Sequence, residues 1–148
     1  MMRRWIVCWM VIIGMLAACS PGVVTLADAE AQAYAAEVAD ISENLLVSLS
    51  ARDEAGFARD MEPIMKEASS GEKFTQIYDG VIGKLGAYVP NSLVLVKVQD
   101  ADRFRNVIYK ADFANELGVT VRVVFTTQDV TPRVTGLWFD SQLLRQKP

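Results

Sequence analysis

The side chains that most often carry out enzymatic chemistry are scarce in this chain. It has no histidine, and its two cysteines are Cys8 and Cys19. Without histidine, Ser-His-Asp and Cys-His nucleophilic arrangements cannot form, and the commonest general base is missing. The set that could transfer a proton is Asp112 with Tyr109 and Tyr78, a carboxylate with two phenolic donors. Acid–base catalysis would therefore depend on these three residues.

An acidic pair, Asp100 and Asp102, lies between two apolar stretches. Two carboxylates at a turn could ligate a divalent cation, which prefers several oxygen ligands. The alternative is a hairpin turn, in which aspartate side chains bond to nearby backbone groups. No third acidic residue is close by in the sequence, so the turn is favoured. We expect neither a metal site nor a cofactor.

The front of the chain is typical of a bacterial export signal. Arg3 and Arg4 give it a positive start, and an apolar run of about fourteen residues extends from Trp5 to Ala18. This run is too short for a permanent span, because a helix needs about twenty residues to cross ~30 Å of hydrocarbon. We therefore expect residues 1–18 to be a signal peptide that is removed.

The end of that run, Leu16-Ala17-Ala18-Cys19, resembles the lipobox of bacterial lipoproteins. The resemblance implies cleavage between Ala18 and Cys19, a diacylglyceryl group on the Cys19 thiol and an acylated amino terminus. A plain secretory signal is the alternative, but a cysteine directly after small residues favours lipidation. Because one acyl chain alone binds a membrane only marginally, the three implied chains are what would make attachment permanent.

The anchor would place the domain outside the cytoplasm. Ser20 follows the cysteine, and in lipoproteins resembling those of enteric bacteria a residue other than aspartate favours the outer membrane. The domain would then face the periplasm. In a bacterium with one membrane it would sit on the outer surface of that membrane, and the sequence leaves this choice open.

The 130 residues from Cys19 onward are enough for one domain with its own core. We expect residues 19–27 to be a lipidated tether and residues 28–148 to be this domain. Cys19 is the last cysteine, so a disulfide within the domain is excluded. Without Arg3 and Arg4, the formal net charge changes from −3 to −5. No run of basic residues is present, which argues against a nucleic-acid partner.

Three to four helical segments are expected in the first part of the domain. Asp28 is positioned to cap a helix that runs to about Ser50, on which apolar residues recur every three to four positions. Asp53 is predicted to cap a second, short segment, and Pro63 fits the first turn of a third.

Ser69 and Glu72 have the spacing of a capping box for the last of these helices. Its predicted apolar face comprises Phe74, Ile77, Tyr78, Val81 and Leu85. Gly86 is expected to end it, since glycine readily adopts the left-handed conformation that terminates helices.

The second part of the domain is typical of β-strands. Four stretches rich in β-branched and aromatic residues are separated by turn-forming segments: Leu93–Val98, Asn106–Phe113, Val119–Thr126 and Val134–Phe139. Helices followed by strands predict the α+β class, here with a four-stranded antiparallel meander.

The register of the second and third strands can be predicted from their alternation. Odd-numbered positions, from Val107 to Phe113 and from Val119 to Phe125, should share the core face. A three-residue loop with Gly118 left-handed would place Asp112 opposite Arg122 as a solvent-facing ion pair. The alternative register puts Lys110 opposite Arg122, and like charges directly opposite are destabilising.

From about Tyr34 to Phe139 the chain resembles a family of small secreted or lipid-anchored prokaryotic proteins, the domain of unknown function 3887. The resemblance rests on Phe57, Asp60, Met61, Met65-Lys66, Phe74, Leu85-Gly86, Tyr88, Val121 to Phe125 and Gly136-Leu137-Trp138-Phe139. It implies a variant of the nuclear transport factor 2-like fold, in which a curved sheet packs around the helices as a cone, and an accessory role with no established activity. Pro90 departs from the family pattern, so we expect that corner to differ.

Aromatic residues could line an apolar pocket in such a cone, although filled core is the favoured interpretation. The candidate pocket residues are Phe57, Phe74, Tyr78, Tyr109 and Trp138, with Phe139 beside the last. A second apolar set is expected among charged residues on the other face of the sheet: Leu93, Leu95, Ile108 and Val124. Such a patch could mediate homodimerisation or be covered by neighbouring residues.

The sequence thus favours a lipid-anchored cell-envelope protein with a non-catalytic binding or interaction domain. Two alternatives stay open. One is a small isomerase- or hydratase-like enzyme that acts on an apolar ligand in the cone. The other is a structural subunit of an envelope complex.

Overall fold

The computed structural model describes residues 22–146, which fold into six helices and a five-stranded sheet. The predicted signal peptide, the cleavage site at Ala18 and the lipid acceptor Cys19 lie outside the described residues. Across the described range, no helix has both the length and the apolar character needed to cross a bilayer. The six helices and the antiparallel sheet place the protein in the α+β class, as predicted.

The helical part is divided more finely than its sequence pattern predicts. The helices are α1 (Asp28–Glu37), α2 (Ala39–Ser50), α3 (Glu54–Ala58), α4 (Pro63–Ala68), α5 (Glu72–Leu85) and, after the sheet, α6 (Gln142–Arg145). The single helix predicted up to Ser50 is interrupted at Val38, which has φ −102° and ψ 8° and is completely buried. The break lets α1 pack on β2 (Val94–Ala101) while α2 packs on α3 and α5.

The predicted helix ends are partly confirmed. The Asp53 side chain accepts a hydrogen bond from the Gly56 amide at 3.0 Å, as a helix cap does, and Pro63 opens α4. Gly86, at φ 75°, ends α5. Asp28 is the first helical residue of α1 and not its cap, a position in which its charge still favours the helix dipole.

The predicted capping box at the start of α5 is wrong. Gly71, with φ 61°, precedes the helix, and no side chain caps it. Ser69 instead donates its hydroxyl hydrogen to the carbonyl of Met65 at 2.7 Å, which closes the end of α4. Ser69 thus closes α4 while Glu72 begins α5, and the left-handed Gly71 lies between them.

The sheet has five strands and not the four predicted. Its antiparallel order follows the chain: β1 (Val24–Thr25), β2 (Val94–Ala101), β3 (Phe104–Ala111), β4 (Val119–Thr126) and β5 (Arg133–Asp140). The additional strand β1 comes from the expected tether: Val24 pairs with Asp100, and the Leu26 amide donates to the Val98 carbonyl at 3.0 Å. An edge strand such as β2 offers unpaired backbone groups, which explains why the tether adds to it.

Both predicted registers of β3 and β4 are wrong, although the predicted faces are right. Arg122 lies opposite Ile108, and Lys110 lies opposite Thr120. The connection runs from residue 112 to 118, because Asp112 Oδ1 accepts a hydrogen bond from the Gly118 amide at 2.8 Å and holds it as a wide loop. Relative to the prediction, the partner of Arg122 moves by four residues, an even number that keeps each side chain on its face.

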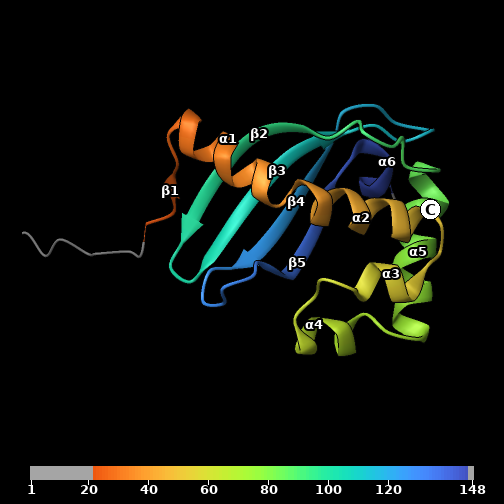
Figure 1. Cartoon of the computed structure of the whole chain (residues 1–148). Helices are drawn as coiled ribbons and strands as arrows, with labels where there is room; N and C mark the ends of the chain where they lie inside the picture. Colours follow the sequence, from red (N-terminus) through yellow and green to blue (C-terminus); the bar gives the residue numbers. More distant parts are fainter. Residues whose placement is uncertain (1–21, 147–148) are drawn as a thin grey trace, which may run out of the picture.

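The helices lie against one face of the sheet, which contains the core. Figure 1 shows α1 and α2 crossing the sheet, with α3, α4 and α5 gathered at one end of the molecule. The odd-numbered residues from Val107 to Ala111 of β3 and from Val119 to Phe125 of β4 are buried there. The largest completely buried side chains include Phe57, Phe113, Phe125, Leu45, Leu46 and Leu49. The outer face, with Arg122 and Trp138, is not covered by any of the described helices.

Candidate functional site

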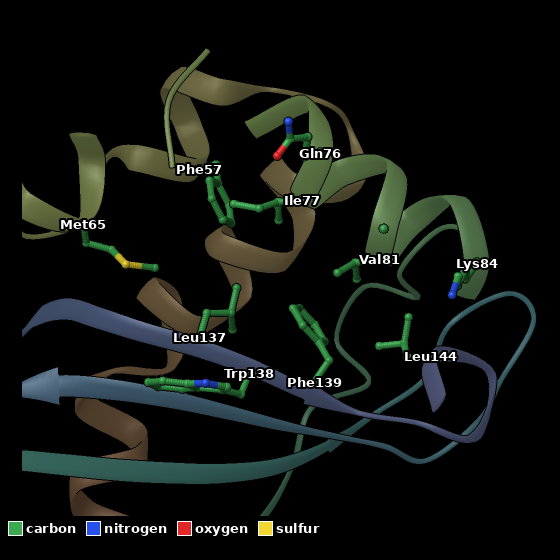
Figure 2. A pocket seen from close by; sticks show the side chains of 11 residues that line it. Phe57, Met65, Gln76, Ile77, Val81, Lys84, Leu137, Trp138, Phe139 and Leu144 are labelled. Atoms are coloured by element: carbon green, nitrogen blue, oxygen red, sulfur yellow. The ribbon is translucent and has the colours of Figure 1, made fainter. Parts of the chain in front are cut away.

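A groove with mostly apolar walls lies between α5 and β5. Its volume is about 410 Å³, within the usual range for small-molecule sites. Figure 2 shows side chains from several elements converging on it. The lining residues are Phe57, Met65, Gln76, Ile77, Gly80, Val81, Lys84, Leu137, Trp138, Phe139 and Leu144. We call this hollow the α5–β5 groove.

The groove forms because α5 has a wider apolar stripe than the core can cover. Phe74, Ile82 and Leu85 point into the core and are buried. Ile77 and Val81, on the flank of that stripe, are only half-buried and line the groove. A helix with an apolar face broader than its packing partner leaves such a flank available.

Gly80 widens the middle of the groove. A Cβ atom built at this position would meet no atom within 4 Å, so the space beside the helix is open there. Opposite it, Leu137 and Phe139 of β5 project toward the helix (Figure 2). Alternation along the strand places these two on the helix side and sends Trp138 to the other.

The polar groups of the groove lie on α5. Gln76 and Lys84 are exposed, and they are the polar side chains that line the groove apart from the indole nitrogen of Trp138. Among the lining residues, all of which are described, Lys84 alone is charged. The groove can therefore hold an apolar body and can accommodate a neutral or anionic group near Lys84.

The three residues predicted for proton transfer are not brought together. Asp112 holds the β3–β4 loop through the Gly118 amide. The Tyr109 hydroxyl is buried against the Ser42 hydroxyl at 3.2 Å, and burial raises the pKa of Tyr109. Tyr78 lies under the guanidinium of Arg52, 5.0 Å from the ring centroid. Each of the three has a separate structural partner.

The five predicted pocket residues are also distributed over the molecule. Phe57 lines the groove, but it is 1% exposed and packs on Phe74, with ring centroids 5.3 Å apart. Trp138 borders the groove at the β5 edge while its ring lies along the sheet. Tyr78 is outside the groove, and Tyr109 lines a different hollow. The structure thus does not bring the five residues together in one pocket, and Phe57 and Phe74 lie in the core, which was the favoured interpretation.

That second hollow lies between α1–α2 and β2–β3 and has a volume of about 420 Å³. Two carboxylates line it: Asp40, which is exposed, and Glu43, which accepts hydrogen bonds from the Tyr88 hydroxyl at 2.7 Å and the Asn91 amide at 2.8 Å. Leu93 and Leu95 lie on this helix side, not on the outer face as predicted. A bulge at Val96 reverses the alternation of β2, so that Leu95 pairs with Tyr109.

The acidic pair is part of a hairpin, as the favoured interpretation has it. Asp100 is ion-paired with Arg105 across β2 and β3, with 2.9 Å between Nη2 and Oδ2. Asp102, at φ 56°, forms the turn. Within residues 22–146 no cluster of three or more aspartate, glutamate, cysteine or histidine residues could hold a metal ion.

No protein-family model matches the chain, and neither a curated protein nor a solved structure matches it.

Proposed function

We propose that this protein is a lipid-anchored cell-envelope protein whose domain binds a small amphiphile in the α5–β5 groove without catalysing its conversion. The observation that carries the proposal is the composition of the groove: apolar walls on two sides and one exposed cation, Lys84, at its rim. The apolar part of the ligand would lie between Val81 and Phe139. Its polar or anionic end would lie beside Lys84.

Binding is favoured over catalysis by what lines the groove. General acid–base catalysis needs a titratable group within hydrogen-bond reach of the reacting atom. The lining offers a lysine ammonium and an amide, with no carboxylate beside them. The isomerase- or hydratase-like alternative relied on Asp112 and Tyr109, whose polar atoms are engaged elsewhere.

The anchor and the fold family belong to the same proposal. The lipobox-like segment ending at Cys19 supports attachment at the periplasmic face of an outer membrane or at the outer surface of a single membrane. Helices packed on one face of an antiparallel sheet, with a groove between them, support a relationship to the nuclear transport factor 2-like cone.

The groove is tested with two fluorescent probes that differ in charge. 1-Anilinonaphthalene-8-sulfonate is apolar and anionic, and N-phenyl-1-naphthylamine is its neutral counterpart. We expect Gly80→Leu to fill the groove and weaken both probes at least tenfold. Gly83→Leu is the matched control, because Gly83 is also exposed on α5 and open to space but does not line the groove.

Lys84→Gln then separates the polar contribution from the apolar one. It should weaken the sulfonate probe several-fold and leave the neutral probe unchanged, since only the former has a charge to pair with the ammonium. Equal binding by the wild type, Gly80→Leu and Gly83→Leu would show that the groove is not a ligand site. If the sulfonate probe binds Lys84→Gln as tightly as the wild type, the proposal that Lys84 contacts an anionic end of the ligand is rejected.

The anchor has its own test. Cys19→Ser should abolish labelling by a fatty-acid probe in bacterial cells that express the full chain. Labelling that survives this substitution would contradict lipidation at Cys19.

A second candidate is a structural subunit that associates through the outer face of the sheet. Val94 is 63% and Trp138 is 50% exposed there, next to the half-buried Ile108. Exposed apolar side chains on one face favour self-association or a partner protein. Trp138→Lys should lower the oligomeric state in sedimentation if this face forms a homodimer, and a monomer at all concentrations would exclude one.

A further inference from the structure

The amino-terminal strand enters the domain at one particular end of the sheet. β1 begins at Val24, which pairs with Asp100, one residue before the end of β2. In an antiparallel meander, the β2–β3 turn and the β4–β5 loop lie at this same end (Figure 1). We call the surface formed by residues 22–24, 102–103 and 127–133 the tether end.

The tether end is held together as one surface. The Thr127 amide donates a hydrogen bond to the Arg103 carbonyl at 3.0 Å, which links the two connections. Arg103 also stacks on Phe104, with its guanidinium carbon 5.2 Å from the ring centroid. The β1 pairing fixes the entering chain beside them.

The length of chain before β1 keeps the lipid close. Val24 is five positions after Cys19, and a fully extended chain spans at most about 3.6 Å per position, or roughly 18 Å. This is shorter than the eight-residue strands of the sheet, which measure about 27 Å. An acyl chain on Cys19 therefore brings the tether end, and not the opposite end, to the bilayer.

The side chains at the tether end fit a lipid surface. Val130, at the tip of the β4–β5 loop, is fully exposed, and Val23 and Val24 are 58% and 60% exposed. Arg103 and Arg133 are exposed beside them, where they can face lipid phosphates. Asp102 and Asp129 lie there as well, so the attraction is local to the arginines and not a uniform positive patch.

We propose that the tether end docks on the bilayer, with Val130 in the headgroup region and the α5–β5 groove held at the opposite, aqueous side. This inference rests on the proposed lipid anchor, which supplies the affinity. The exposed valines and arginines then set only the orientation. The partner is the lipid surface itself.

The test uses the fact that a chain beginning at Cys19 has one thiol and one tryptophan, Trp138, and retains every described residue. Cys19 is coupled to a maleimide-bearing phospholipid in vesicles of phosphatidylcholine and phosphatidylglycerol. In a Trp138→Phe background, a reporter tryptophan is placed by Val130→Trp. The matched control is Leu117→Trp, 76% exposed in the β3–β4 loop at the other end of the sheet.

Brominated lipids quench tryptophans that reach the headgroup and upper acyl region. We expect quenching at position 130 to exceed that at position 117 at least threefold. Arg103→Gln with Arg133→Gln should reduce this ratio, whereas Arg145→Gln, an exposed cation near the other end, should not. Equal quenching at the two positions, or stronger quenching at 117, would overturn the proposal.

Coupling through maleimide makes this result independent of lipidation in cells. Failure of fatty-acid labelling at Cys19 would reject the anchor alone. Failure of position-dependent quenching on coupled vesicles would reject the docking orientation alone.

Discussion

The two faces of the sheet differ in what stabilises them. On the helix side, Val107, Val121 and Phe125 are completely buried among helices. On the outer side, Ile108, Arg122 and Trp138 form a cross-strand row in which Arg122 and Trp138 are exposed. Burial of apolar side chains stabilises the helix side. On the outer side, the stabilising contact is that of the Arg122 guanidinium with the Trp138 ring. Because side chains alternate along a strand, one face of the sheet supplies the buried core and the other supplies the accessible surface.

The largest expected effect is on the helix side. Phe125→Ala should lower the free energy of unfolding by about 3–5 kcal/mol, because it leaves a cavity where the ring meets Tyr34 edge-on at 6.2 Å. Urea unfolding measures this change. A loss below about 1 kcal/mol would mean that this face is not the main core.

An intermediate effect is expected at Gly136, where the Trp138 ring lies close to the backbone of the outer face. A Cβ atom at Gly136 would lie 2.2 Å from Trp138 Cζ3, so the indole lies directly on the glycine. Gly136→Ala should displace the ring into solvent at a cost of about 1–3 kcal/mol. Trp138 emission, read in a chain that begins at Cys19, should shift to the red. Unchanged emission would contradict this stacking.

A smaller effect is expected from the cation on the outer face. Arg122 places its guanidinium carbon 4.4 Å from the Trp138 ring centroid. Arg122→Met keeps an unbranched apolar stem but removes the charged guanidinium, and should cost about 0.5–1 kcal/mol. A double-mutant cycle with Trp138→Ala isolates the pair, and zero coupling would contradict the interaction.

The smallest effect concerns Glu116 in the β3–β4 loop, at the end of the sheet away from β1. Glu116 accepts hydrogen bonds from the Ser141 hydroxyl and the Leu143 and Gln142 amides, which lower its pKa below the ordinary 4.5. The ionised form is therefore favoured by folding. Its stabilisation is present above pH 4.5 and is lost as the pH falls through the lower, folded-state pKa.

Acid titration of the unfolding free energy checks this sign. Glu116→Gln should flatten the decline below pH 4.5 and leave the remaining pH dependence unchanged. A variant that declines as steeply as the wild type would show that Glu116 does not contribute to acid sensitivity.

Local patterns predicted much of this fold. The faces of β3 and β4, the Asp53 cap, Pro63 and the Gly86 stop follow from side-chain period and backbone geometry, which depend on neighbours in the sequence. The register could not be predicted, because it depends on the wide loop that Asp112 closes. The bulge at Val96, which moved Leu95 to the helix side, gives no local signal either.

The site was less predictable than the fold. Ile77 and Val81 were recognisable as apolar positions of a helix, but the sequence does not say where the core stops covering them. The aromatic residues expected to form a pocket have the size and composition of core, and Phe57 and Phe74 are core. The groove is a space that no side chain fills, in part because Gly80 has none, and the tertiary arrangement is needed to locate such a space.

The pairing of β1 with β2 bears on the route by which the proposed ligand would reach the α5–β5 groove. If the tether end lies on lipid as proposed, the groove residues Leu137 to Phe139 would stand about 14–20 Å along β5 from Arg133, above the headgroups. A cargo molecule that leaves the bilayer would have to cross that gap, whereas one carried by a protein in the aqueous compartment would arrive at the right height. If the proposed anchor and docking hold, the short tether would thus favour ligand donors that reach the groove from the aqueous side.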